Sequence, residues 1–481
     1  MKAIFTITIC LLLLFPYKVY TQNAVTRLLS KSYMKGASVS IMITDIDNGS
    51  VVFNYDANRE VIPASVMKTI TTATALEILG ENFRYETTVL HDGKITDSVL
   101  EGNLYIRGSG DPTLGSSLVK NDSDKILREW ISVIKYMGIK KITGAVIADE
   151  SVFDTEGISM KWLREDLGSY YGQGSYGINI YDNLYSLFLS SGEPGSKPEI
   201  EKYIPEIPSF SFRNYLTTTT TTEDSTYITG FPYSNERYLY GTVPADRSGY
   251  IIKGDIPDPA LFLAQYFTNM LEKEQITVLG TPTCYRILSQ KGQWSRQGWK
   301  YMTTTYSPPL REIIRITNRA SSNLYADALL KTIGLKYRPE DVISSFGRGI
   351  EVLNRHWEER GLNTSSLWMF DGSGLSPSDK VTAGFLCNLL SYMATKSAVS
   401  ESFIESIPLA GKEGTVANIL RGSELQGNTR LKSGSMSRVR GYAGYVNKDD
   451  RRYAVAIIVN NFSCKQNQMI ADIEQLILSL F

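Results

Sequence analysis

Apolar and polar residues are interspersed near both ends of the chain in a way that predicts strands. Ser38–Thr44 and Val51–Tyr55 flank Asp47-Asn48-Gly49, and two such runs around an Asn-Gly turn indicate a β-hairpin. Near the C-terminus we expect three antiparallel strands with a turn at Asn447–Asp450; they are Thr429–Ser435, Gly441–Val446 and Arg452–Asn460. The two groups of strands predict one domain assembled from both ends of the chain.

A helix after the first hairpin is apolar on nearly all its faces. Pro63 is well placed to open it, it runs through Thr69–Leu79, and Gly80 suits its C-terminal end. A helix without a polar face is a buried one. Three further helices are predicted in the second half of the chain: Leu310–Asn318, which follows Pro308-Pro309, Leu324–Ile333 and an amphipathic Gln466–Leu480.

The region from Phe83 to Ile287 has a different pattern. Short strand-like runs alternate with turn residues; they are Leu104–Ile106, Ala145–Ala148 and Tyr250–Gly254. One amphipathic helix is predicted over Lys125–Met137, and the threonine run Thr217–Thr222 predicts an exposed loop.

The N-terminus has the pattern of a secretory signal peptide. Lys2 precedes an apolar run from Ala3 to Phe15, which is shorter than the roughly 20 residues that a membrane span needs. We expect residues 1–22 to be removed, with cleavage near Thr21–Asn23; an uncleaved N-terminal anchor is the alternative. No later segment is apolar enough to cross a membrane, so we expect no stable span after processing.

Charge and length limit the possible functions. The 481 residues contain 50 Lys plus Arg and 50 Asp plus Glu, so no net charge favours nucleic acid or anionic lipid. A chain of this length predicts two or three domains. The cysteines that remain after export, Cys284, Cys387 and Cys464, are scattered and have neither a disulfide-framework pattern nor zinc spacing.

The chain has only two histidines, His91 and His356, and we expect both at the surface. Neither lies near a Ser or Cys nucleophile pattern. If the protein is a hydrolase, its base is therefore not expected to be histidine, and we expect no metal site.

A serine three residues before a lysine occurs four times: Ser32/Lys35, Ser65/Lys68, Ser117/Lys120 and Ser132/Lys135. Only Ser65 stands at the start of a buried helix. The spacing places its hydroxyl and the Lys68 amine on one face, and burial lowers the pKa of a lysine toward that of a useful base. The helix N-terminus also supplies N–H groups to an oxyanion. A capping serine beside a snorkelling lysine is the alternative.

Two later triplets favour the catalytic interpretation. Ser321-Ser322-Asn323 joins two predicted helices, where a short loop can direct polar side chains into a cleft. Lys432-Ser433-Gly434 lies on a predicted strand and is followed by Ser435, so a cation, a hydroxyl and a close-approach glycine can hold a carboxylate there. The order Ser-x-x-Lys, Ser-x-Asn, Lys-Ser/Thr-Gly on suitable elements is a specific pattern.

This pattern resembles the penicillin-binding proteins of the D-alanyl-D-alanine carboxypeptidase/endopeptidase type, the low-molecular-mass class C group. The resemblance covers nearly the whole mature chain. Besides the triplets it includes residues 62–80, Gly102–Leu104 with Gly108–Leu114, Asp371–Ser376 and Pro408–Gly411. The long gap between Ser65 and Ser321 fits this family, which inserts two domains there; class A β-lactamases lack them.

The resemblance implies a catalytic role for three side chains. Ser65 would attack the carbonyl between two terminal D-alanines and become acylated, while Lys68 would take its proton. Ser321 would relay a proton toward the leaving amine. Water would then deacylate the enzyme, and no cofactor is implied.

It also implies substrate-binding residues. Asn323 would orient the substrate amide, and Lys432 with Ser433 and Gly434 would hold the terminal carboxylate. Lys432 would further help to lower the pKa of Lys68 by like-charge repulsion. Backbone N–H groups of Ser65 and Ser435 would form the oxyanion hole. Asp166, Tyr171 and Gly172 are candidates for the border of the cleft.

Two positions depart from the commoner family pattern. The third triplet has Ser433 where threonine is more frequent, which keeps the hydroxyl and predicts an altered affinity for β-lactams. Ser322 stands where the family often has aspartate, so its hydrogen bonds are in question. A β-lactamase-like hydrolase and a non-catalytic cell-wall binding or scaffold protein on the same fold remain alternatives.

The implied fold is α+β: a serine β-lactamase/DD-peptidase-like domain, with an antiparallel sheet flanked by helices and two inserted smaller strand-rich domains. We assign 24–85 and 288–481 to the peptidase domain, 86–105 and 185–287 to the second domain, and 106–184 to the third. The implied partners are peptidoglycan stem peptides and β-lactams in the periplasm, with no nucleic acid; a homo-oligomer is left open.

Overall fold

The structure is a computed structural model that describes residues 23–119, 123–223, 225–336 and 344–481. The chain divides into two compact units: the first contains residues 1–81, 314–321 and 350–481, and the second contains 82–313 and 322–349. The predicted signal peptide lies outside the described residues, and the three-domain division stays a prediction. Within the described ranges, no helix combines the length and apolar character that a membrane crossing requires.

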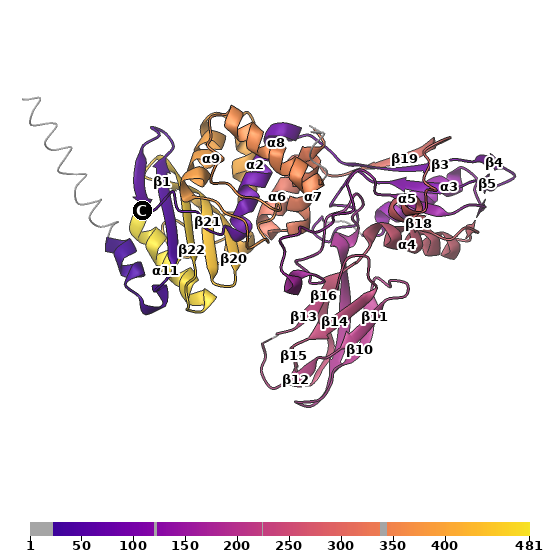
Figure 1. The fold of residues 1–481 in the computed structure, drawn as a ribbon, viewed down its shortest axis with the longest axis horizontal. Helices are drawn as coiled ribbons and strands as arrows, with labels where there is room; N and C mark the ends of the chain where they lie inside the picture. Colours follow the sequence, from indigo (N-terminus) through magenta and orange to yellow (C-terminus); the bar gives the residue numbers. More distant parts are fainter. Residues whose placement is uncertain (1–22, 120–122, 224, 337–343) are drawn as a thin grey trace, which may run out of the picture. The chain divides into compact units, whose positions relative to one another are not determined.

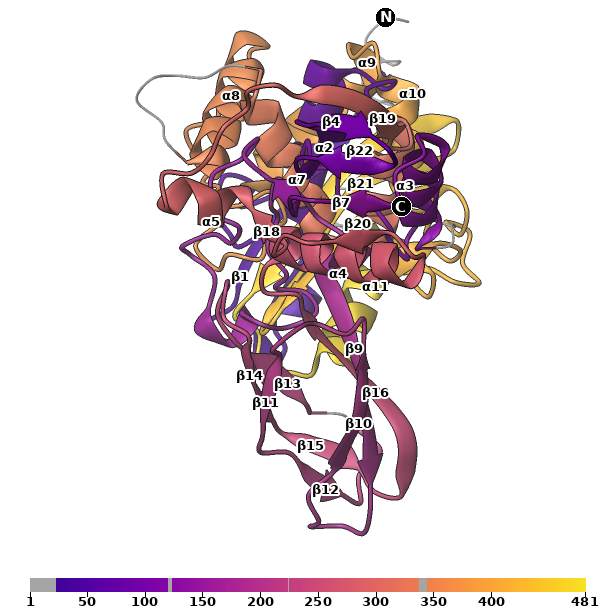
Figure 2. The same ribbon diagram turned by 90° about the vertical axis from the view of Figure 1, so that its right-hand side faces the viewer.

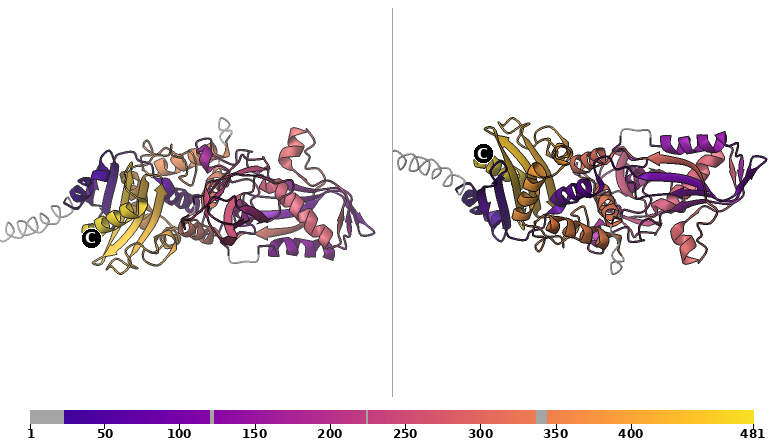
Figure 3. Two further views of the ribbon diagram at one scale, coloured as in Figure 1. Left: turned by 90° about the horizontal axis from the view of Figure 1, so that it is seen from below. Right: turned by 90° about the horizontal axis from the view of Figure 1, so that it is seen from above.

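The first unit is built on a five-stranded antiparallel sheet in the order β2-β1-β22-β21-β20. Its strands are β1 (Ser38–Asp45), β2 (Val51–Tyr55), β20 (Thr429–Met436), β21 (Val439–Lys448) and β22 (Arg451–Asn460). β1 pairs with β22 along its whole length, so the indigo and yellow ends of the chain lie side by side (Figures 1 and 3). The prediction of one sheet assembled from both ends is confirmed.

Helices cover both faces of this sheet. Val39 and Ile41 of β1 belong to the same apolar cluster as Ile473 of α11. Met42, whose side chain points to the other face because strand side chains alternate, accepts a hydrogen bond at its carbonyl from Cys387 Sγ of α9. The helical elements of this unit are η1 (Ser32–Met34), η2 (Ala64–Val66), α2 (Met67–Leu79), α9 (Ala383–Thr395), α10 (Ser400–Ser406), η5 (Gly414–Val416) and α11 (Gln466–Leu480).

The buried helix predicted after Pro63 is α2. The first ten residues of α2 are all buried, in agreement with the absence of a polar face. One 3₁₀ turn, η2, precedes it and contains Ser65. Gly80 ends the helix with φ +83°, a conformation that favours glycine.

Among its described residues, the second unit contains five sheets; strands β9, β10, β14 and β16 are labelled in the lower part of Figure 2. Their orders are β18-β8-β6-β3-β19, β17-β7-β5-β4, β10-β9-β16, β11-β14-β13 and β12-β15. The strands are β3 (Glu86–His91), β4 (Lys94–Thr96), β5 (Val99–Glu101), β6 (Leu104–Arg107), β7 (Lys141–Ile142), β8 (Val146–Asp149), β9 (Leu184–Ser191), β10 (Glu199–Ile204), β11 (Ser211–Asn214), β12 (Thr217–Thr219), β13 (Tyr227–Thr229), β14 (Glu236–Tyr240), β15 (Thr242–Pro244), β16 (Arg247–Asp255), β17 (Thr277–Val278), β18 (Thr283–Cys284) and β19 (Lys300–Tyr306).

Helices pack with these sheets around one apolar core. Trp130 of α3 and Phe267 of α4 are both buried in it, with ring centroids 5.6 Å apart. The helical elements of this unit are α3 (Lys125–Tyr136), η3 (Arg164–Asp166), η4 (Tyr181–Asn183), α4 (Pro259–Lys273), α5 (Tyr285–Gln290) and α7 (Asn323–Gly334); α6 (Leu310–Ala320) and α8 (Ser345–Glu359) contribute residues to both units. The antiparallel sheet of the first unit, the mixed parallel and antiparallel sheets of the second and the helices around them confirm the α+β class.

The predicted loop at the threonine run is wrong in part. Thr217–Thr219 is not loop but strand β12, which pairs in parallel with β15 and buries Thr218; Thr220–Thr222, after the strand, are exposed. Threonine suits a pleated strand because of its branched side chain.

Both histidines are buried rather than exposed. His91 is 5% exposed at the end of β3, and burial lowers its pKa. His356 is 8% exposed, with Nε2 3.5 Å from Glu77 Oε2. The turn after His91 and the charged helix around His356 suggested surface positions, but the folded chain buries both side chains.

Candidate active site

Ser65 and Lys68 form a direct hydrogen-bonded pair in the first unit. Lys68 is fully buried, and its Nζ donates to Ser65 Oγ at 2.9 Å and to the carbonyl of Ser373 at 2.6 Å. Ser65 itself is half-buried in the η2 turn. A nucleophile within hydrogen-bonding distance of an amine is the arrangement that general-base activation requires.

The backbone before Ser65 is strained. Ala64 is fully buried and has φ +47°, in the left-handed region that non-glycine residues rarely adopt. Its carbonyl packs against Gly374, where an added Cβ would lie only 2.0 Å from that oxygen. Strain of this kind persists only where surrounding structure enforces it, and such sites are often functional.

Asp371 organises the loop that contacts Lys68. Its Oδ1 accepts from the N–H groups of Ser373 at 3.0 Å and Gly374 at 2.6 Å, and its Oδ2 accepts from Ser376 at 2.8 Å. The loop thereby presents the Ser373 carbonyl to Lys68. The family resemblance includes Asp371–Ser376 but implies no role for it. The contact with Lys68 is made by a backbone carbonyl, which cannot be identified from residue types.

Lys432 contacts Ser321 across the first unit. Lys432 is fully buried on β20, and its Nζ donates to Ser321 Oγ at 2.9 Å and to the Ser433 carbonyl at 2.7 Å. Ser321 has φ +56°. Burial, and after it the positive charges of Lys68 and Arg440, hold the pKa of Lys432 well below the ordinary lysine value.

β20 is an edge strand that packs directly on the Ser65 turn. A Cβ added to Gly434 would lie 2.4 Å from the Pro63 carbonyl and 3.1 Å from the Ser65 nitrogen, so only glycine fits. Ser433 Oγ lies 2.7 Å from Thr415 Oγ1, and Ser435, on the same strand, is exposed. The strand therefore brings Lys432, Gly434 and the Ser65 turn together.

Asn323 belongs to the second unit, where it begins α7. The Ser322 side chain caps this helix by accepting from the Tyr325 N–H at 3.4 Å. Asn323 Nδ2 donates to the Tyr171 carbonyl at 2.8 Å. Its contact with a substrate amide stays a prediction, as do those of Asp166, Tyr171 and Gly172.

A competing Ser-x-x-Lys pair has a surface role. Ser132 Oγ in α3 donates to the Arg128 carbonyl, and Lys135 is 48% exposed in an ion pair with Glu274. The choice of Ser65/Lys68 by helix burial is consistent with this geometry. Lys120 of another pair lies outside the described residues.

A family comparison identifies the chain. Residues 21–478 match the model of the D-Ala-D-Ala carboxypeptidase 3 (S13) family. The chain belongs to this family. It is therefore a serine-type hydrolase, and the family resemblance inferred from the three triplets is confirmed.

Individual S13 relatives are distant but cover most of the chain. A D-alanyl-D-alanine carboxypeptidase of Actinomadura sp. (strain R39) is 26% identical over 442 residues, which are 89% of this chain and 79% of that protein. The D-alanyl-D-alanine carboxypeptidase DacB of Haemophilus influenzae is 25% identical over 443 residues, 90% of this chain and 88% of the relative.

A solved structure shows the same fold. Penicillin binding protein 4 of Haemophilus influenzae superposes with a TM-score of 0.79 at 22% identity, covering 93% of this chain and 97% of that one. The predicted DD-peptidase-like fold is thus confirmed for this S13 family member.

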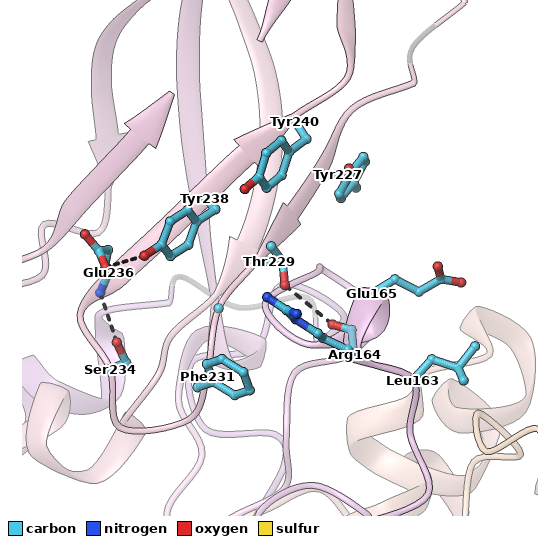
Figure 4. A pocket seen from close by; sticks show the side chains of 11 residues that line it. Leu163, Arg164, Glu165, Tyr227, Thr229, Phe231, Ser234, Glu236, Tyr238 and Tyr240 are labelled. Carbon is cyan, nitrogen blue, oxygen red and sulfur yellow. Dashed lines mark hydrogen bonds between the residues drawn. The ribbon is translucent and has the colours of Figure 1, made fainter. Parts of the chain in front are cut away.

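One cavity lies within the second unit. It encloses about 700 Å³ beside the β11-β14-β13 sheet and contains none of the residues that the three triplets supply. Figure 4 shows Tyr227, Tyr238 and Tyr240 along one side of it, and Arg164 reaching under Thr229.

Proposed function

We propose that the protein is a penicillin-binding serine DD-peptidase that cleaves the bond after a D-alanine in peptidoglycan stem peptides. The observation that carries the proposal is the hydrogen bond of 2.9 Å from buried Lys68 to Ser65 Oγ. The second pair, Lys432 and Ser321, supports it because it supplies a cation and a hydroxyl in the same unit.

The reaction begins with proton transfer. Lys68, as the free amine, takes the proton of Ser65 while Oγ forms a bond to the substrate carbonyl carbon. The oxyanion is stabilised by the N–H groups of Ser65 and Ser435. Ser321 passes a proton to the departing amine as the peptide bond breaks, which leaves an acyl ester on Ser65. Water then adds to this ester and releases the acid.

The edge strand β20 binds the substrate. An extended peptide lies along such an edge through main-chain hydrogen bonds. The positive charge of Lys432 attracts the carboxylate that follows the scissile bond, with Ser433 and Gly434 beside it. Asn323 orients the amide of the preceding residue. A β-lactam carries the same carboxylate and a reactive carbonyl, which accounts for the expected binding of penicillin.

The site of action is the periplasm, where peptidoglycan is accessible to an exported protein. The N-terminal pattern of Lys2 and the apolar run Ala3–Phe15 supports this location.

Digestion of purified sacculi tests the activity and its preference. Separation of the released muropeptides distinguishes two outcomes: loss of cross-linked dimers indicates endopeptidase action, and loss of pentapeptides indicates carboxypeptidase action. A digest identical to that of Ser65→Ala contradicts the proposal. Normal muropeptide binding without cleavage would favour a scaffold, and rapid turnover of nitrocefin would favour a β-lactamase.

A further inference from the structure

Arg440 is a buried cation that the sheet places beside the predicted carboxylate-binding strand. It lies on β21 directly opposite Ser435 of β20, and directly opposed side chains share one face of a sheet. Only 8% of Arg440 is exposed. Burial holds the pKa of Lys432 well below the ordinary lysine value, and the positive charges of Lys68 and then Arg440 lower it further.

The hydrogen bonds of the Arg440 guanidinium go to one side chain, that of Tyr442. Its Nε and Nη2 both donate to the Tyr442 hydroxyl, the first at 2.9 Å, and the guanidinium carbon lies 4.8 Å from the centre of the same ring. In the ranges that the structure covers, Arg440 forms no ion pair with a carboxylate. A guanidinium has five N–H donors, and a buried charge without an anion is costly.

Packing on Tyr442 explains the orientation of Arg440 but not its charge. Lys432 is also a buried cation, and the hydrogen bonds of its Nζ go to Ser321 Oγ and the Ser433 carbonyl. The positive charge of Arg440 adds to that of Lys68 in disfavouring the charged form of Lys432, whose pKa is lowered first by burial. An anion that binds beside Arg440 and Lys432 would relieve this repulsion.

We propose that Arg440 binds the carboxylate of the substrate residue that follows the scissile bond, together with Lys432. The planar guanidinium suits a carboxylate, which it can hold through two parallel hydrogen bonds. This inference rests on the proposed function, since it assigns a further specificity residue to the same reaction. The same contact holds the carboxylate of a penicillin.

The test compares benzylpenicillin with its methyl ester, which has the same reactive ring but no carboxylate. The rate constant of acylation is measured with both compounds for the wild type and for Arg440→Gln. We expect the variant to lose about 10- to 100-fold with benzylpenicillin, the scale of a charge-assisted hydrogen bond. With the ester its rate should change by less than about 2-fold, since that ligand lacks the partner group.

Arg438→Gln is the matched control. Arg438 lies two residues earlier, is exposed, and donates to the carbonyls of Phe462 and Asn461. Arg438→Gln should leave the ratio of the acylation rates with benzylpenicillin and its methyl ester unchanged. If Arg440→Gln does not fold, Arg440→Lys replaces it, because lysine keeps the charge but loses the planar guanidinium. A lower ratio of the acylation rate with benzylpenicillin to that with the methyl ester supports the inference. An unchanged ratio contradicts it.

The outcomes separate the two proposals. An equal loss with both compounds in Arg440→Gln would assign Arg440 a structural role and overturn the inference. A wild type that the acid and the ester acylate equally fast would also overturn it, while the proposed function stands. A wild type that neither compound acylates would contradict the proposed function itself.

Discussion

Lys432 Nζ lies 2.9 Å from Ser321 Oγ, although the two residues are 111 positions apart in the chain. The strand that carries Lys432 is the edge of the sheet built from both ends of the chain. Ser321 stands between two helices, in a left-handed conformation. The contact joins the cation of the third triplet to the hydroxyl of the second, and the proposed proton relay to the leaving amine would use this hydroxyl.

Gly434→Ala tests how closely β20 packs on the nucleophile. A Cβ at this position would lie 2.4 Å from the Pro63 carbonyl, so the strand or the Ser65 turn must move. We expect a loss of about 1–3 kcal/mol in the free energy of unfolding and a much slower acylation by penicillin. Gly192→Ala is the control, because its nearest neighbour would lie at 3.4 Å. Equal behaviour of the two variants would contradict the packing described.

Lys68→Met tests the general base. Methionine fills a similar volume but cannot take the proton of Ser65, so acylation by penicillin should slow by about 10²- to 10⁴-fold. The control is Lys135→Met, which removes the exposed lysine of another Ser-x-x-Lys pair and should keep the wild-type rate. Stopped-flow or gel-based labelling measures both. Retention of more than a tenth of the rate by a folded Lys68→Met would argue for another base.

Asp371→Asn tests the loop that presents the Ser373 carbonyl. One amide oxygen can replace only part of the carboxylate, which accepts from three N–H groups. We expect a loss of about 1–3 kcal/mol in the free energy of unfolding and slower acylation. Denaturant titration measures the first and penicillin labelling the second. Asp246→Asn, at an exposed position of the second unit, should match the wild type in both; an equally stable Asp371→Asn would show that the loop needs no carboxylate.

The lowered pKa of Lys432 predicts a pH dependence of substrate binding. Lys432 is a cation below this pKa and neutral above it, so attraction for a carboxylate is lost as the pH rises through it. The KM for an acyl-D-Ala-D-Ala substrate should therefore rise at a pH well below the ordinary lysine pKa of 10.5. Lys432→Arg, which stays charged, should lack this alkaline rise. A wild-type KM that stays constant up to pH 10.5 would contradict the assignment.

Much of the first unit could be predicted from residue patterns. The hairpin at Asp47–Gly49 and the helix at Gln466–Leu480 follow from local alternation and amphipathicity, which persist in the folded chain. Among the four Ser-x-x-Lys pairs, Ser65/Lys68 could be selected because the helix that follows Ser65 is apolar on nearly all faces. This property can be read from the sequence alone. The order of the three triplets then gave the family.

What the sequence could not reveal depends on tertiary packing. Burial of His91 and His356 arises from neighbours distant in the chain, and charged residues nearby gave the opposite indication. The left-handed backbone of Ala64, whose carbonyl packs against Gly374, cannot be inferred from alanine itself. The position of Arg440 opposite Ser435 could not be predicted, because it depends on the register in which β21 pairs with β20.

The most direct test of the central claim is to locate the acyl group after reaction with benzylpenicillin. Mass spectrometry of the digested protein should show one penicilloyl adduct, on the peptide that contains Ser65, and Ser65→Ala should show none while retaining the wild-type melting temperature. An adduct on another serine, or an unmodified wild type after prolonged exposure, would contradict the assignment of Ser65 as the nucleophile.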